Sequence, residues 1–226
     1  MATTPEQTLL DFHSNKVATL LEAAAQCTTG TAAEADVDDG PTTAKGASAD
    51  AGTSSSGGGG IMAHAIVCFE TIPATAEAVL LATFMAATHP AVPFWISLQC
   101  SGVDTVADQS LLATACTSIV KAAAGGRLIG VGANCFSPAL APELMANIRA
   151  ALPAAFDVLC YPNRGESWDA QHKEWHATED SVAVDTNVGV LAKQWVDAGA
   201  TVIGGCCRVG SAEIAAMKAA VVQPNT

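Results

Sequence analysis

Five short apolar segments alternate with five longer amphipathic segments between residues 65 and 221. Apolar runs of this length predict buried strands, and apolar residues every three or four positions predict helices. The strands are expected at 65–69, 94–98, 128–133, 158–161 and 201–203, and the helices at 74–87, 108–124, 142–152, 184–198 and 212–221. Repeated βα units build a parallel sheet, so the chain is predicted to be α/β, either doubly wound or part of a (β/α)8 barrel.

Three regions differ in composition. Residues 1–26 have apolar side chains at helical spacing over 5–25, and we predict a helix that precedes the first strand. Residues 27–60 are rich in Thr, Ala, Gly, Ser and Asp and cannot bury an apolar face, which predicts a disordered insertion. Residues 61–226 contain all five βα units.

Charge and targeting signals exclude several functional classes. The net charge is -12, and the 10 basic side chains form no cluster, so we expect neither nucleic-acid nor membrane binding. The N-terminus lacks a basic region followed by an apolar run, and no apolar segment is long enough to cross a bilayer. Eight cysteines without a secretory signal predict a reducing compartment, the cytoplasm, with thiols free for metal binding or chemistry.

Reactive side chains gather where the predicted strands end. Glu70 ends the first strand, Asn134 and Cys135 follow the third, and Cys206 and Cys207 follow the fifth. The carboxyl ends of parallel strands lie at one edge of a sheet, where such folds place their sites. Three thiolates with one open coordination position are typical of a catalytic zinc site.

The adjacent cysteines leave alternatives open at this point. Consecutive residues of a strand point to opposite faces, so Cys206 and Cys207 bind one ion together only where the backbone bends. The preceding Gly204 and Gly205 permit such a bend. Spacing alone is equally compatible with two buried thiols or a vicinal redox pair.

Four sequence blocks occur in a fixed order: FETIP at 69–73, GVGANC at 130–135, YPNRGESWD at 161–169 with a downstream Trp175, and VIGGCCR at 202–208. In this order they resemble the homocysteine S-methyltransferase family, and the resemblance extends over about 65–221. It implies a TIM-type (β/α)8 barrel that is incomplete here, with about five βα units and the N-terminal strands missing.

The resemblance also implies a site and a reaction. Cys135, Cys206 and Cys207 would bind Zn2+, Glu70 would lie beside the amino group of the substrate, and Asn134 would shape the pocket next to the metal. The implied function is zinc-dependent methyl transfer from a sulfonium donor (S-methylmethionine or S-adenosylmethionine) to L-homocysteine, which forms methionine. Betaine is the competing donor, used by a related branch.

Two other functions remain open. A truncated, non-catalytic homologue would keep the thiolate metal site, and a redox protein would use Cys206 and Cys207. Missing strands would leave two unpaired edges, which favours a homo-oligomer or a complementing chain. Arg164 stands where the family usually has a small residue. Glu166 would favour a cation near the site, although a solvated loop charge is the simpler interpretation, and we interpret the stretch around His172 and His176 as a loop with a solvated helical turn.

Overall fold

The computed structural model describes residues 4–28, 66–169 and 171–222. Its main sheet has five parallel strands in the order β1-β2-β3-β4-β7. The strands are β1 (Val67–Ile72), β2 (Pro93–Leu98), β3 (Arg127–Asn134), β4 (Asp157–Tyr161) and β7 (Val202–Ile203). The helices after the strands are α2 (Thr75–Thr88), α3 (Leu112–Ala122), the 3-10 turn η2 (Pro138–Leu140), α4 (Ala141–Ala151), α5 (Glu179–Asp197) and α6 (Ser211–Val221). The predicted α/β fold with a parallel sheet is confirmed.

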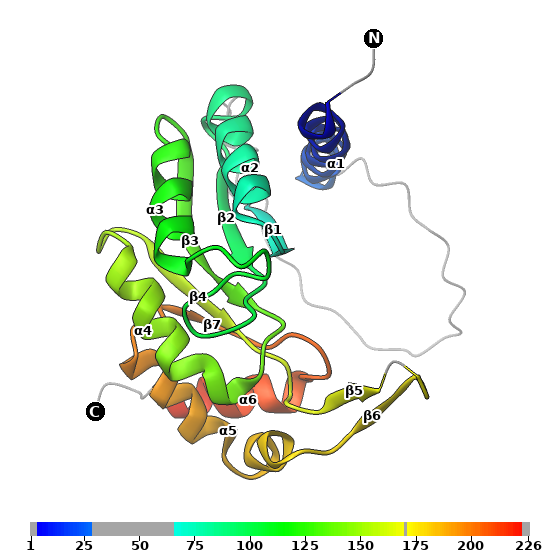
Figure 1. Ribbon diagram of the computed structural model, residues 1–226, viewed down its shortest axis with the longest axis vertical. Helices are drawn as coiled ribbons and strands as arrows, with labels where there is room; N and C mark the ends of the chain where they lie inside the picture. The colour runs from blue at the N-terminus through cyan, green and yellow to red at the C-terminus, as the bar shows by residue number, and fades with distance from the viewer. Residues whose placement is uncertain (1–3, 29–65, 170, 223–226) are drawn as a thin grey trace, which may run out of the picture.

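Helices α2 to α6 lie along one side of the curved sheet (Figure 1). Within the described residues β1 and β7 each pair with a single neighbouring strand, so the sheet does not close into a complete barrel. None of the helices in the described residues is long and apolar enough to cross a membrane.

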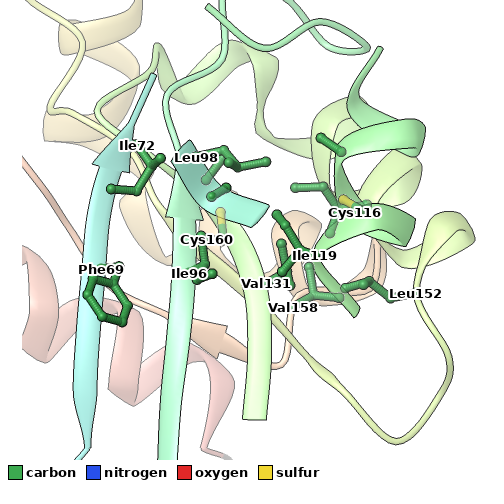
Figure 2. Packing of buried hydrophobic residues seen from close by; sticks show 14 of the residues in the cluster. Phe69, Ile72, Ile96, Leu98, Cys116, Ile119, Val131, Leu152, Val158 and Cys160 are labelled. Atoms are coloured by element: carbon green, nitrogen blue, oxygen red, sulfur yellow. The ribbon is translucent and has the colours of Figure 1, made fainter. Parts of the chain in front are cut away.

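The core lies between the sheet and the helices that cover it. Figure 2 shows side chains of β2, β3 and β4 on the side of the sheet that α3 covers, with Ile96, Val131 and Val158 on the same side as Ile119. All four of these side chains are fully buried. Burying an aliphatic side chain of this size stabilises a fold by about 1.5–3 kcal/mol. Buried and exposed residues alternate along β1 from Val67 to Glu70, so Cys68 and Glu70 lie on an exposed face, and a register shift precedes the buried Ile72.

Strands β3 and β4 approach each other too closely for a side chain at one position. A Cβ atom on Gly132 would lie 2.1 Å from the carbonyl oxygen of Leu159. No real Cβ atom tolerates that contact with backbone, so glycine is required there. This close pairing brings the carboxyl ends of the two strands together.

Helix α1 (Pro5–Thr28) packs beside α2. His13 of α1 contacts Glu77 of α2 through a ring nitrogen 3.0 Å from the carboxylate, and its ring lies edge-on to Phe69 of β1. The helix extends to Thr28, two residues into the range that we predicted as an insertion. The remainder of that predicted insertion, 29–60, lies outside the described residues.

The stretch after β4 differs from the prediction. A two-stranded antiparallel hairpin, β5 (Ser167–Asp169) and β6 (Glu174–His176), stands where we expected a loop with a helical turn. The Asp169 carboxylate accepts hydrogen bonds from the backbone N–H groups of Gln171 and His172 and lies 2.7 Å from His172 Nδ1. These local bonds favour a tight turn over a helix, so the helical interpretation of this stretch was wrong.

Candidate metal centre

Three cysteines from two strand ends meet at the carboxyl edge of the sheet. Cys135 directly follows β3, and Cys206 and Cys207 follow the end of β7. The Sγ atom of Cys135 lies 2.6 Å from that of Cys206 and 3.7 Å from that of Cys207, and the Sγ atoms of Cys206 and Cys207 are 4.0 Å apart. Among the residues that the structure describes, this is the single group of three or more His, Cys, Asp or Glu side chains with ligand atoms this close together.

The sulfur positions fit a zinc ion. Tetrahedral zinc with Zn–S bonds of about 2.3 Å places its sulfur ligands about 3.8 Å apart. Two of the three separations match this value, and the Cys135–Cys206 pair would have to open by about 1 Å to admit the ion. Cys135 and Cys206 are partly exposed and Cys207 is exposed, which leaves access for a fourth ligand.

A turn lets both adjacent cysteines face the same point. Strand β7 ends at Ile203, and a hydrogen bond from the N–H of Val209 to the carbonyl of Cys206 closes a turn. A Cβ atom on Gly205 would lie 2.1 Å from the side chain of Val209, so glycine is needed there for close packing. Because Cys206 and Cys207 lie in a turn and not in a strand, the alternation of strand side chains does not separate them.

The segment after β4 holds the two cysteine-bearing loops together. The N–H of Cys206 donates to the carbonyl of Pro162 at 2.8 Å, and the N–H of Cys207 donates to Asn163 Oδ1 at 3.2 Å. On the other side, the N–H of Asn163 donates to the carbonyl of Phe136, next to the first cysteine. One segment therefore fixes the relative position of all three thiols.

The electrostatics of the thiols differ within the cluster. Burial and the thiol contacts with Cys206 and Cys207 raise the pKa of Cys135. Partial burial opposes ionisation of Cys206 too, but hydrogen bonds from the Cys135 thiol and the Asn134 amide outweigh it and lower the pKa of Cys206. The cluster thus favours one thiolate first, which is the form that binds metal ions.

Asn134 is a buried structural link between two strands and the cluster. Its Oδ1 atom accepts hydrogen bonds from the N–H of Thr71 at 2.8 Å and from the hydroxyl of Ser97 at 2.7 Å. Its Nδ2 atom donates to the hydroxyl of Thr71 at 2.7 Å and lies 3.7 Å from Cys206 Sγ. Thr71 has φ 59, which a β-branched residue rarely adopts. The Asn134 side chain therefore holds a strained backbone at Thr71 in place. Sequence reasoning missed Thr71 and Ser97, because neither residue type signals this role.

Glu70 lies on the exposed face of β1, away from the covering helices. Burial, and to a smaller extent the negative charge of Glu70, raises the pKa of Tyr161 on β4. The Glu70 carboxylate and the Tyr161 phenol therefore lie on the same face of the sheet, opposite the covering helices.

The burial of one carboxylate beside the cysteine pair was not predicted. The side chain of Glu166 is 8% exposed, and its carboxylate lies 2.9 Å from Arg208 Nε and 3.6 Å from Arg164 Nη1. The interpretation of Glu166 as a solvated loop charge was wrong. Its burial depends on Arg208, which lies 42 residues further along the chain and is invisible to local patterns.

The chain is thus an α/β protein with an open parallel sheet. Three thiols at the carboxyl ends of its strands form a cluster that could hold a metal ion. Comparison with known families makes this class specific. The model of the family described as homocysteine S-methyltransferase matches residues 63–221, and the chain belongs to this family.

Several known proteins are similar to this chain. A betaine-homocysteine S-methyltransferase of Drosophila melanogaster is 28% identical over 157 residues, which cover 67% of this chain and 46% of the relative. Homocysteine S-methyltransferase 2 of Arabidopsis thaliana is 33% identical over 153 residues, which cover 67% of this chain and 44% of the relative. The selenocysteine Se-methyltransferase of Brassica oleracea var. italica is 32% identical over 153 residues, with 67% and 42% covered. The chain spans about half the length of the curated relatives it matches.

Solved structures agree with the fold. The oxidized form of the homocysteine methyltransferase MmuM from Escherichia coli superimposes with a TM-score of 0.53 at 25% identity, over 68% of this chain and 44% of that one. The metallated form of the same enzyme has a TM-score of 0.52 at 22% identity, over 68% and 44%. This second likeness shows the shared fold only. The incomplete barrel that the sequence predicted is thus confirmed.

Proposed function

We propose that this chain is a zinc-dependent thiol methyltransferase that transfers a methyl group from a sulfonium donor, S-methylmethionine or S-adenosylmethionine, to L-homocysteine. The observation that carries the proposal is the thiol cluster of Cys135, Cys206 and Cys207, whose spacing suits one zinc ion with an open fourth position. Relatives that carry homocysteine and selenocysteine methyltransferase names support the reaction class.

The chemistry requires an electron-rich sulfur at neutral pH. When bound, a zinc ion would hold the homocysteine sulfur as a thiolate, although a free thiol has a pKa near 8.5. The thiolate sulfur forms a bond to the methyl carbon while the bond from that carbon to the sulfonium sulfur breaks. The leaving thioether takes the electron pair, the proton of the substrate thiol goes to solvent, and methionine is formed.

Two side chains would position homocysteine. We assign the ammonium group of homocysteine to Glu70, whose carboxylate lies on the open face of β1. We assign a wall of the pocket to Asn134, whose amide already has four contacts within the protein and is therefore rigid. Both assignments follow the sequence prediction.

Methionine formation tests this function. The chain is incubated with homocysteine, zinc and each methyl donor in turn, with betaine included as the competing donor. We expect turnover with a sulfonium donor, and a higher KM for homocysteine in Glu70→Gln, because the ammonium group loses its carboxylate partner. Bound zinc without turnover by any donor would contradict methyl transfer.

One observation favours a second candidate, a non-catalytic homologue that keeps the metal site. Within the described residues, β1 and β7 each have an unpaired edge, and an edge of this kind recruits other strands. A chain whose edges stay unpaired would lack part of the substrate pocket and keep the metal site alone, whereas pairing with a further copy or a complementing chain would belong to the active enzyme. Light scattering combined with the methionine assay separates the two candidates, because zinc binding without turnover in every oligomeric state supports the non-catalytic homologue and turnover contradicts it. No specific observation favours the redox alternative: Cys206 and Cys207 are free thiols whose sulfurs lie 4.0 Å apart, a separation that reduced neighbouring thiols and zinc ligands share.

A further inference from the structure

The loop that bears two of the three thiols packs on the core through Val209 but is exposed around its second cysteine. Cys207 and Arg208 are exposed, and the turn begins after Gly204 and Gly205, which restrict the backbone least of all residues. Arg208 has φ 65, a left-handed conformation that a non-glycine residue keeps only where its surroundings hold it. The contacts of Arg208 therefore hold this loop in its conformation.

Arg208 is held on two sides. Its Nε atom donates to the buried carboxylate of Glu166 at 2.9 Å, and its guanidinium lies 5.7 Å from the centre of the Trp175 ring. The first contact joins the cysteine loop to the segment after β4. The second joins it to β6 of the hairpin, by a cation–π contact that suits a planar guanidinium.

The carboxylate of Glu166 is shared with a second guanidinium. Arg164 Nη1 lies 3.6 Å from it, and the backbone N–H of Arg164 donates to the carbonyl of Cys207 at 3.1 Å. Arg164 also pairs with Asp185 of α5 and lies 3.8 Å from Glu213 of α6. A buried carboxylate is costly without such partners, so Glu166 needs both arginines and keeps both in place.

From these contacts we infer that Glu166 and Arg208 form a clamp that positions Cys207 against Cys135 and Cys206 for zinc binding. The inference rests on the proposed metal centre and adds two residues that are not among its three thiol ligands. Both are positioning residues, since they act through the backbone of the cysteine turn. Outer partners of metal ligands of this kind typically change metal affinity by about 10- to 100-fold when they are lost.

Zinc affinity of the full chain tests the clamp. The dissociation constant is measured by competition with a chromophoric chelator for the wild type, Glu166→Gln, Arg208→Gln and the double variant. Absorption bands of the Co2+-loaded protein report the geometry of the thiolate site. The matched controls are Arg127→Gln, at the start of β3, and Glu143→Gln, on α4. Arg208 has a side chain that is 43% exposed, so its replacement tests the clamp without emptying a buried site.

We expect each clamp variant to bind zinc about 10- to 100-fold more weakly than the wild type, with altered Co2+ bands. The double variant should be no weaker than the worse single variant, because the two residues act as one unit. Affinities within twofold of the wild type and the controls, or losses that add up independently, would overturn the clamp. A wild type that binds no zinc would overturn the metal centre and the clamp together, whereas normal zinc binding by all variants would overturn the clamp alone.

Discussion

Replacing Asn134 by alanine tests the link between the sheet and the thiol cluster. The change removes the acceptor of the Thr71 N–H and of the Ser97 hydroxyl, together with the donor to the Thr71 hydroxyl. Ser97 is fully buried, and leaving its hydroxyl unpaired costs about 1–3 kcal/mol. The N–H and hydroxyl of Thr71 also lose their partner, which together costs about 1–2 kcal/mol because part of the backbone strain at Thr71 relaxes at the same time.

Together these terms predict that Asn134→Ala lowers the free energy of unfolding by about 2–5 kcal/mol. For a chain of this length that corresponds to a fall of roughly 4–20 °C in Tm. The assay is urea denaturation followed by circular dichroism, in the presence of a reductant and a chelator so that metal binding does not contribute. Asn147→Ala is the matched control, because the Asn147 amide donates one bond, to the carbonyl of Val103.

A second substitution sharpens this test. In the Asn134→Ala background, Ser97→Ala removes the unpaired hydroxyl and should cost at least about 1 kcal/mol less than it does in the wild type. A loss below about 1 kcal/mol in Asn134→Ala, or purely additive effects with Ser97→Ala, would refute the reasoning.

Three further predictions address packing, acid stability and the metal. Gly132→Ala should destabilise the fold by about 3 kcal/mol or more, since its Cβ would meet the Leu159 carbonyl, whereas Gly102→Ala, with 3.9 Å of clearance, should leave urea midpoints unchanged. Hydrogen bonds from Ser110 and Thr75 lower the pKa of Asp108 below its usual 3.8, so its contribution is present above that pH and lost as the pH falls through the folded-state pKa. Asp108→Asn should therefore lower the urea midpoint at pH 7 and bring the midpoints at pH 7 and pH 3 closer together than in the wild type. The same difference in midpoint as in the wild type would contradict this prediction. Zinc binding should release protons and strengthen as the pH rises, because burial and neighbouring thiols raise the pKa of Cys135. Calorimetry in buffers of different ionisation enthalpy measures the protons released, and a zinc affinity that does not change with pH would contradict this prediction.

The regular part of the fold could be predicted because its signals are local and repeated. Each strand of the main sheet is an apolar run, and each helix carries its own period, so all five βα units were found. Parallel strands end at one edge, so the strand ends that carry Cys135, Cys206 and Cys207 were expected to meet there, and the family resemblance implied that the three bind one ion. The chain does bend beside the glycine pair, in the turn that the N–H of Val209 closes on the carbonyl of Cys206.

The stretch between β4 and α5 could not be predicted in the same way. Strands β5 and β6 have three residues each, too few to show a period, and their hairpin is fixed by the bonds of Asp169. Helix α5 begins at Glu179, five residues before the predicted start, because Thr178 and Ser181 form a capping box. The burial of Glu166 depends on Arg208, which only the folded chain brings near.

The zinc content of the purified chain tests the central claim most directly. Wild type, Cys207→Ala and Cys68→Ala are compared; Cys68 is an exposed cysteine outside the cluster. The account predicts one zinc ion per chain in the wild type and in Cys68→Ala, and loss of the ion in Cys207→Ala. A wild type without zinc, or a Cys207→Ala variant that retains all of it, would contradict the three-cysteine metal centre.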